Sequence, residues 1–149
     1  MTRGKFVVIT DDKVFSSFEF NGDMYYDGHG HGPEVIERLG RVNNTDDLNK
    51  EVREFNENNH NYEIDDGDTF FKCQNPIDFS DEYFSYWFSD YLYIKNLAST
   101  EKVIKDYDGK EHTILPNQIF VFDFGQNLAG VCQMIDMVVA GRLKEPSPL

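Results

Sequence analysis

The first forty residues constrain the fold of this chain more than any other segment. Residues 5–10 hold a short apolar run, Asp11-Asp12-Lys13 follows as a turn, and residues 14–20 alternate in polarity, with Val14 and Phe20 on one face. This pattern predicts a β-hairpin. Three glycines then alternate with two histidines just before Pro33, a residue suited to the first turn of a helix. The chain is therefore expected to open as two strands, a sharply bent turn and a helix.

Two more helices are expected from apolar spacing. Thr45 is suited to cap a helix whose buried stripe is Leu48, Val52 and Phe55. The apolar residues between 128 and 139 also recur at helical spacing, and we expect a third helix there.

Short β-rich runs elsewhere predict further strands. They cover residues 69–73, 91–97, 101–107, 110–115 and 118–124. Asp108-Gly109 is typical of a two-residue hairpin turn.

The 149 residues suffice for one domain with a substantial core. We therefore predict a single compact α+β domain over residues 1–143, followed by a flexible tail at 144–149. Its sheet is expected to be largely antiparallel, with about six or seven strands and about three helices.

Negative charge is concentrated in the first part of the chain. Residues 11–90 carry 20 acidic and 6 basic side chains, a net of −14, whereas the whole chain has a net charge of −13. Such a field repels nucleic acid and anionic membranes and attracts basic partners. The acids alternatively serve solubility alone, as in a structural or accessory subunit.

Eight acidic residues are predicted to form a surface that binds a basic protein. Five are expected on the second helix, opposite its apolar stripe, and three in the loop that follows. They are Asp46, Asp47, Glu51, Glu54, Glu57, Asp65, Asp66 and Asp68.

The glycine-histidine run offers an alternative site. In an extended segment, residues two apart project to one side, so Asp27, His29 and His31 are candidate ligands for one metal ion. A bent turn with exposed histidines explains the same run. We expect no cofactor.

Thr2 is the candidate for a catalytic nucleophile. Once Met1 is removed, the N-terminal amine serves as the base for the threonine hydroxyl. Thr2 or the Asp27/His29/His31 group would then make the chain a small hydrolase or a metal-dependent enzyme.

The opening Thr2-Arg3-Gly4, the hairpin, and Tyr26 followed by Gly30 and Gly32 resemble a group of small phage, bacterial and fungal proteins. Members begin with Thr-Arg-Gly or Gly-Thr-Arg-Gly and carry a Tyr-Pro-x-Gly-x-Gly segment after the first hairpin. In this chain, Asp27 replaces the proline. The resemblance implies a shared architecture and a phage or prophage origin, and it implies no mechanism.

Binding rather than catalysis is therefore the function we expect. The partner would be a basic protein, including a nucleic-acid-binding host defence factor that the chain inhibits by mimicking DNA. With no apolar run of bilayer length and no secretory signal, we expect a cytoplasmic location, in the bacterial host if the chain is phage-derived.

Overall fold

A computed structural model of the chain describes nine segments of its fold. They are residues 3–17, 19–20, 22–25, 30–59, 69–72, 77–78, 90–105, 110–123 and 128–132. Within these segments the chain forms two helices and nine strands, which confirms the α+β class. The expected tail at 144–149 lies outside them.

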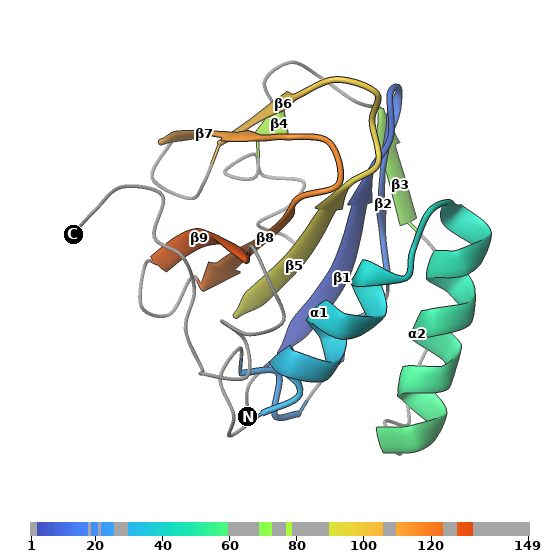
Figure 1. The fold of residues 1–149 in the computed structure, drawn as a ribbon. Helices are drawn as coiled ribbons and strands as arrows, with labels where there is room; N and C mark the ends of the chain where they lie inside the picture. The colour runs from blue at the N-terminus through green and yellow to red at the C-terminus, as the bar shows by residue number, and fades with distance from the viewer. Residues whose placement is uncertain are drawn as a thin grey trace.

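The larger sheet has six strands in the order β3-β2-β1-β5-β8-β9 (Figure 1). Its members are β1 (Gly4–Ile9), β2 (Lys13–Ser16), β3 (Thr69–Lys72), β5 (Tyr91–Asn96), β8 (Ile119–Asp123) and β9 (Leu128–Cys132). The central strands β1 and β5 pair in parallel, and all other neighbours in this sheet pair antiparallel. Most pairings in this sheet are therefore antiparallel, as predicted, but the described residues hold nine strands in two sheets rather than about six or seven in one.

A second sheet of three strands lies on one face of the first. It consists of β4 (Ile77–Asp78), β6 (Lys102–Lys105) and β7 (Glu111–Ile114), in the order β4-β6-β7. β6 and β7 pair antiparallel, as the hairpin prediction requires. The expected Asp108-Gly109 turn lies outside the described residues.

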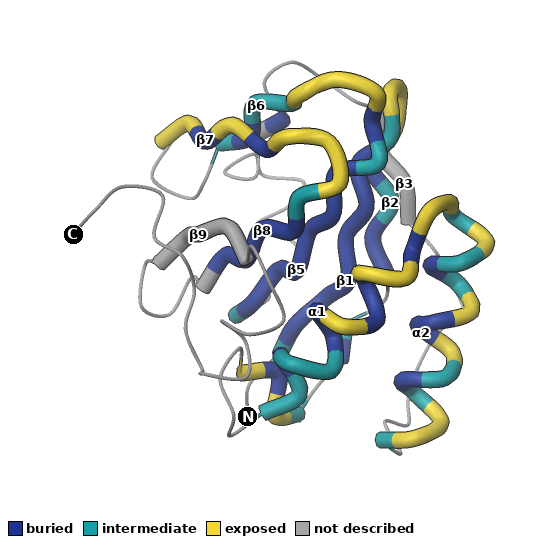
Figure 2. Tube along the Cα trace, viewed as in Figure 1, coloured by how far each residue is buried: buried dark blue, intermediate teal, exposed yellow. Residues whose placement is uncertain are grey.

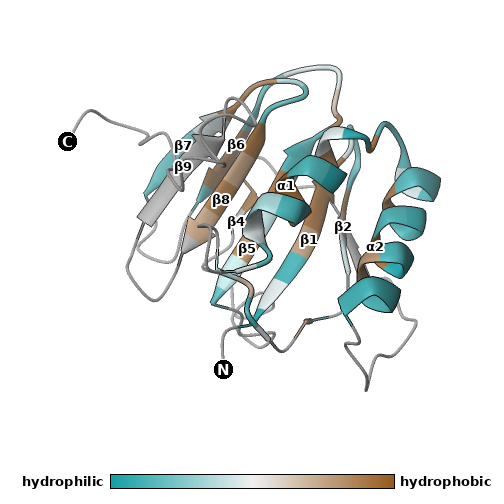
Figure 3. Cartoon of the chain, turned by 60° about the horizontal axis from the view of Figure 1, so that its bottom comes forward, coloured by the Kyte–Doolittle hydropathy of each residue, from teal (hydrophilic) through white to brown (hydrophobic). Residues whose placement is uncertain are grey.

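Two helices cover the opposite face of the six-stranded sheet, α1 (Gly32–Gly40) and α2 (Thr45–Asn59) (Figures 1 and 3). The central strands thus have helices on one side and the small sheet on the other, and Figure 2 shows them buried along their length. Phe6 and Val8 of β1 face the helices, whereas Val7 and Ile9 face the small sheet. All four are at most 1% exposed, so the six-stranded sheet supplies the two cores of the domain.

The β2 side of the hairpin contains one extra residue. Val14 pairs with Ile9 and Ser16 with Val7, whereas the isolated bridge between Phe20 and Gly4 is offset by one residue. Such an insertion moves the following side chain to the other face of the sheet. Phe20 therefore joins the helix-side core and not the Val14 side, and the prediction that Val14 and Phe20 share a face is wrong.

The residue that caps α2 is Asn44 rather than Thr45. The Asn44 side-chain oxygen accepts a hydrogen bond from the Asp47 backbone N–H at 2.8 Å, and the Asn44 carbonyl accepts one from Leu48 N–H. The side-chain bond gives the Asp47 N–H, which has no backbone partner within the helix, a hydrogen-bond acceptor. Thr45 is the first residue of the helix itself, so the predicted start was one residue late.

The expected third helix is wrong over its first five residues. Residues 128–132 form β9, which pairs antiparallel with β8. Pairing satisfies backbone donors and acceptors along β8, and a short apolar run is compatible with strand as well as helix. The rest of the predicted helix lies outside the described residues.

Candidate functional site

Five of the eight predicted binding residues lie on α2, where their surroundings are described. Asp65, Asp66 and Asp68 lie outside the described residues. The buried stripe of α2 is the predicted one, Leu48, Val52 and Phe55. Phe55 meets the rings of Phe6 and Phe20 with centroid distances of 5.3 and 4.8 Å, which fixes the helix on the sheet.

Glu51 is buried rather than displayed on the surface. It lies three residues after Leu48, close enough to the apolar stripe to face α1. Its Oε1 accepts hydrogen bonds from Arg38 Nη1 at 3.0 Å and from Arg41 Nη2 at 2.9 Å. The side chains of Glu51 and Arg38 are each only 8% exposed. Glu51 therefore joins α1 to α2 and is unavailable to a partner, which corrects its predicted role.

The ion pair between Glu51 and the two arginines shifts the pKa values of its members. Burial alone would raise the pKa of Glu51, but the hydrogen bonds from Arg41 and Arg38 outweigh burial and hold it below its ordinary value. Burial likewise opposes the charge on Arg38, yet hydrogen bonds to Glu34 and Glu51 raise its pKa. The contact between the helices is consequently made by charged groups at neutral pH.

Two other predicted residues make bonds within the domain. Asp47 Oδ2 accepts a hydrogen bond from the Asn43 backbone N–H at 3.0 Å, where the chain enters α2. Glu54 Oε2 lies 3.3 Å from Arg38 Nη1, although its side chain is 45% exposed. Both carboxylates therefore have structural partners while remaining partly open to solvent.

Asp46 and Glu57 are exposed, and no ion pair involves either of them in the described part of the chain. They lie on the outer face of α2, eleven residues apart, with the exposed cations Lys50 and Arg53 between them. The outer face of α2 is thus mixed in charge rather than uniformly acidic. Its unpaired acids lie near the two ends of the helix.

Residues 30–32 of the glycine-histidine run are described, and the structure explains the presence of Gly30 and His31. A Cβ atom on Gly30 would lie 2.6 Å from the carbonyl oxygen of Asp23 and 2.7 Å from Cβ of Tyr25, so only glycine fits. The His31 ring packs edge-on against Phe55 at 5.5 Å. Gly30 therefore permits a close backbone approach, and His31 docks the start of α1 on α2.

The start of α1 offers few open donors to an anion. His31 N–H donates to the Asp23 carbonyl, Gly32 N–H donates to the Tyr25 carbonyl, and Pro33 has no N–H. Backbone N–H groups at helix starts bind phosphates only when they point outward unpaired. This turn is therefore not built as a phosphate-binding loop.

The metal hypothesis concerns residues that are mostly undescribed. Asp27 and His29 lie outside the described segments, and within those segments no group of three or more potential ligands is placed to hold a metal ion. His112, the second described histidine, is buried against Phe120 and Phe122. Neither described histidine stands in a ligand group.

Thr2 also lies outside the described residues, but the next residue, Arg3, is described. Arg3 N–H donates to Asp90 Oδ2 at 2.9 Å, and Tyr91 N–H donates to the Arg3 carbonyl at 3.0 Å. Arg3 also lies 3.6 Å from Glu19. Arg3 is therefore anchored beside the first residue of β5.

Lys5 is a buried cation that the sequence patterns did not single out. It is 5% exposed on β1, and burial lowers the pKa of its amine to about 8, against a smaller opposing effect of Glu19. The only sequence signal was one cation next to an apolar run. Lys95, also buried, has a different role, since its amine donates to the Val42 and Gly40 carbonyls at the end of α1.

Comparisons with models of protein families, with curated proteins and with solved structures give no match to this chain. Neither helix in the described segments is long and apolar enough to span a bilayer.

Proposed function

We propose that this protein is an acidic docking protein that binds a basic protein surface. The observation that carries the proposal is the uneven charge, a net of −14 within residues 11–90. The described residues hold 16 acidic and 12 basic side chains, a net of −4 out of −13 for the whole chain. Most of the excess thus belongs to segments such as 61–68, which follow directly from the end of α2.

The docking surface that we propose includes the ends of α2 and excludes its middle. Asp46 and Glu57 contribute exposed carboxylates, and the proposal includes Asp65, Asp66 and Asp68, which follow α2 in the sequence. Glu51 is excluded because Arg38 and Arg41 neutralise it. A charge-complementary surface of this kind raises the rate of encounter with a basic partner.

A nucleic-acid-binding host factor is the partner class that fits this charge best. Carboxylates placed where phosphates would lie compete for the same cationic groove. The resemblance to phage proteins supports such a target, because a phage benefits from blocking a host defence nuclease. The mixed charge of the α2 outer face confines the mimicry to the helix ends and the acidic loop.

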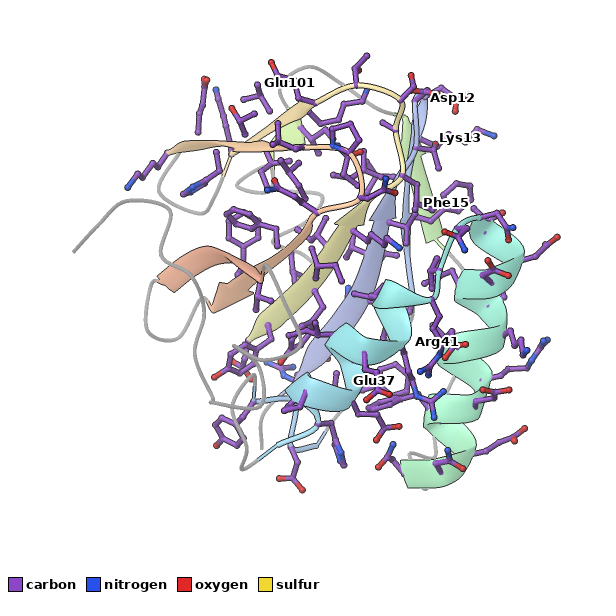
Figure 4. All side chains as sticks on the ribbon, in the orientation of Figure 1. Asp12, Lys13, Phe15, Glu37, Arg41 and Glu101 are labelled. Carbon is purple, nitrogen blue, oxygen red and sulfur yellow. The ribbon has the colours of Figure 1, made fainter. Side chains whose placement is uncertain are left out.

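The test is affinity capture from a bacterial lysate with the full chain as bait and washes of increasing salt. We expect a basic protein that is released as salt rises, and whose binding to duplex DNA the bait inhibits. The bait variant Asp46→Asn/Glu57→Gln should retain less of it. The matched control Glu101→Gln/Glu111→Gln removes two exposed acids from the β6–β7 hairpin, away from α2, and should retain it fully (Figure 4).

Capture of a neutral or acidic protein would contradict the proposal, and so would a captured protein that stays bound as the salt concentration of the wash rises. Equal losses in the two double variants would show that net charge rather than this surface governs binding.

A second candidate, a small hydrolase with Thr2 as nucleophile, draws support from Lys5. An amine with a pKa of about 8 near the start of β1 is unusual, and such groups concentrate at functional sites. Intact-mass measurement tests it, together with elemental analysis for the metal version at Asp27, His29 and His31. Retained Met1 and the absence of bound metal would eliminate both versions.

A further inference from the structure

Tyr25 is a large hydrophobic residue that the fold holds at the surface. It is 43% exposed, and in the described part of the chain only Leu115, at 46%, is comparable. The neighbouring Met24 is fully buried against Gly4, so the chain at this point is anchored from within. Exposure of Tyr25 is therefore imposed by a fixed backbone.

Hydrogen bonds fix the backbone on both sides of Tyr25. The carbonyls of Asp23, Met24 and Tyr25 accept bonds from His31 N–H, from the Tyr93 hydroxyl and from Gly32 N–H, respectively. Gly30 allows this close approach because it has no Cβ. Three consecutive carbonyls are thus engaged, and ordering Tyr25 for binding carries little further entropic cost.

The Tyr25 ring packs against Tyr91 and remains partly exposed. Its centroid lies 6.0 Å from that of Tyr91, at an interplanar angle of 65°, and Tyr91 stacks in turn on Tyr93. The Tyr25 hydroxyl makes no hydrogen bond within the described segments. Rigid, partly exposed tyrosines of this kind are frequent anchors of protein interfaces.

Acidic side chains belong to the same end of the molecule as Tyr25. Asp23 is exposed two residues earlier. Gly32 links the Tyr25 backbone to the first turn of α1, where Glu34 lies 3.5 Å from Asn59 at the end of α2. The start of α1 and the end of α2 therefore lie at the same end of the molecule, the lower end in Figure 1. Glu57, two residues before the end of α2, belongs to that end.

We propose that Tyr25 is the anchor of the docking surface and that it receives an arginine of the basic partner. The inference rests on the proposed function and names the side chain that is recognised. A guanidinium group stacks on an aromatic face and bonds to carboxylates at the same time, whereas a lysine ammonium is more strongly hydrated. Asp23, two residues before Tyr25, supplies an exposed carboxylate.

The experiment measures binding of two labelled peptides, nona-arginine and nona-lysine, to the full chain by fluorescence anisotropy at low salt. We expect wild type to bind nona-arginine more tightly. Tyr25→Ala should weaken nona-arginine binding about threefold to fivefold and nona-lysine binding less. Tyr25→Phe keeps the ring and should bind like wild type, and Leu115→Ala removes the other exposed hydrophobic side chain as a control.

The outcomes separate this inference from the proposed function. If both peptides bind and Tyr25→Ala binds nona-arginine as well as wild type does, the inference fails and the proposed function stands. If neither peptide binds to wild type, both fail. Circular dichroism of each variant establishes that a loss of binding does not reflect unfolding.

Discussion

At the scale of single residues, burial decides what each charged side chain does. Glu51 and Glu57 are both glutamates of α2, yet Glu51 is buried between two arginines and Glu57 is exposed. Residues three apart share a helix face, so the position of Glu51 relative to Leu48 was visible in the sequence. Its arginine partners lie on another helix, and their approach depends on how α1 and α2 pack.

Glu51→Gln should destabilise the fold by about 3 kcal/mol, because it leaves Arg38 buried with weakened compensation for its charge. Urea denaturation measures the change. The control is Glu37→Gln, which breaks the exposed pair with Arg41, seen in Figure 4, and should cost less than about 0.5 kcal/mol. Equal costs for the two variants would show that the buried pair is not structurally important.

Lys5 should make stability depend on pH in the alkaline range. Its pKa is about 8 in the folded protein and 10.5 as an ordinary lysine, so above pH 8 the unfolded chain holds more protons and unfolding free energy rises with pH. Relative to that of Lys5→Met, the unfolding free energy of the wild type should increase by about 2 kcal/mol between about pH 7 and about pH 10.

Denaturation of both proteins across this range measures the gain. Lys50→Met, on the exposed face of α2, controls for the loss of one charge. If the difference in unfolding free energy between wild type and Lys5→Met stayed constant over this pH range, Lys5 would titrate as an exposed lysine does.

At the scale of elements, the turn into α1 depends on one glycine. Gly30→Ala should destabilise the protein by more than about 1 kcal/mol, because its Cβ would overlap two backbone oxygens. Gly40→Ala is the matched control, since nothing lies within 4 Å of its Cβ and alanine favours helix. Thermal unfolding should place Gly30→Ala below wild type and Gly40→Ala at or above it; the reverse order would refute the close approach.

The start of α2 gives a second test. Asn44→Ala should cost about 1 kcal/mol, because the Asp47 N–H loses its partner. Thr45→Ala should change stability by less than about 0.5 kcal/mol, since Thr45 lies within the helix. Chemical denaturation of the two variants decides between the caps, and a larger effect for Thr45→Ala would restore the sequence-based assignment.

Most elements were predictable because their signals are local. Polarity alternation, the stripe of α2 and the turn residues located β1, β2, α1, α2 and the β6–β7 hairpin. The extra residue before Phe20, the parallel pairing of β1 with β5 and the strand at Leu128 depend on contacts between distant segments. No local pattern encodes such pairings, because the same apolar run satisfies a strand or a helix.

At the scale of the whole molecule, net charge was predictable from composition, whereas its placement was not. The sequence identified the acids of α2 but not that Lys50 and Arg53 share their outer face, or that Arg38 and Arg41 neutralise Glu51. Tyr25 was missed as well, because its exposure follows from hydrogen bonds to α1. Among the described residues of α2, the unpaired acids thus lie near the two ends of the helix, and its inner face is used for packing.

The rate at which the full chain associates with its captured partner, measured by stopped-flow as salt rises from about 0.05 M to about 0.5 M, tests the docking proposal most directly. Salt screens the attraction between exposed charges, so we predict that the association rate constant falls about tenfold or more over this range. An association rate that stays constant over this range would contradict an acid-directed docking surface.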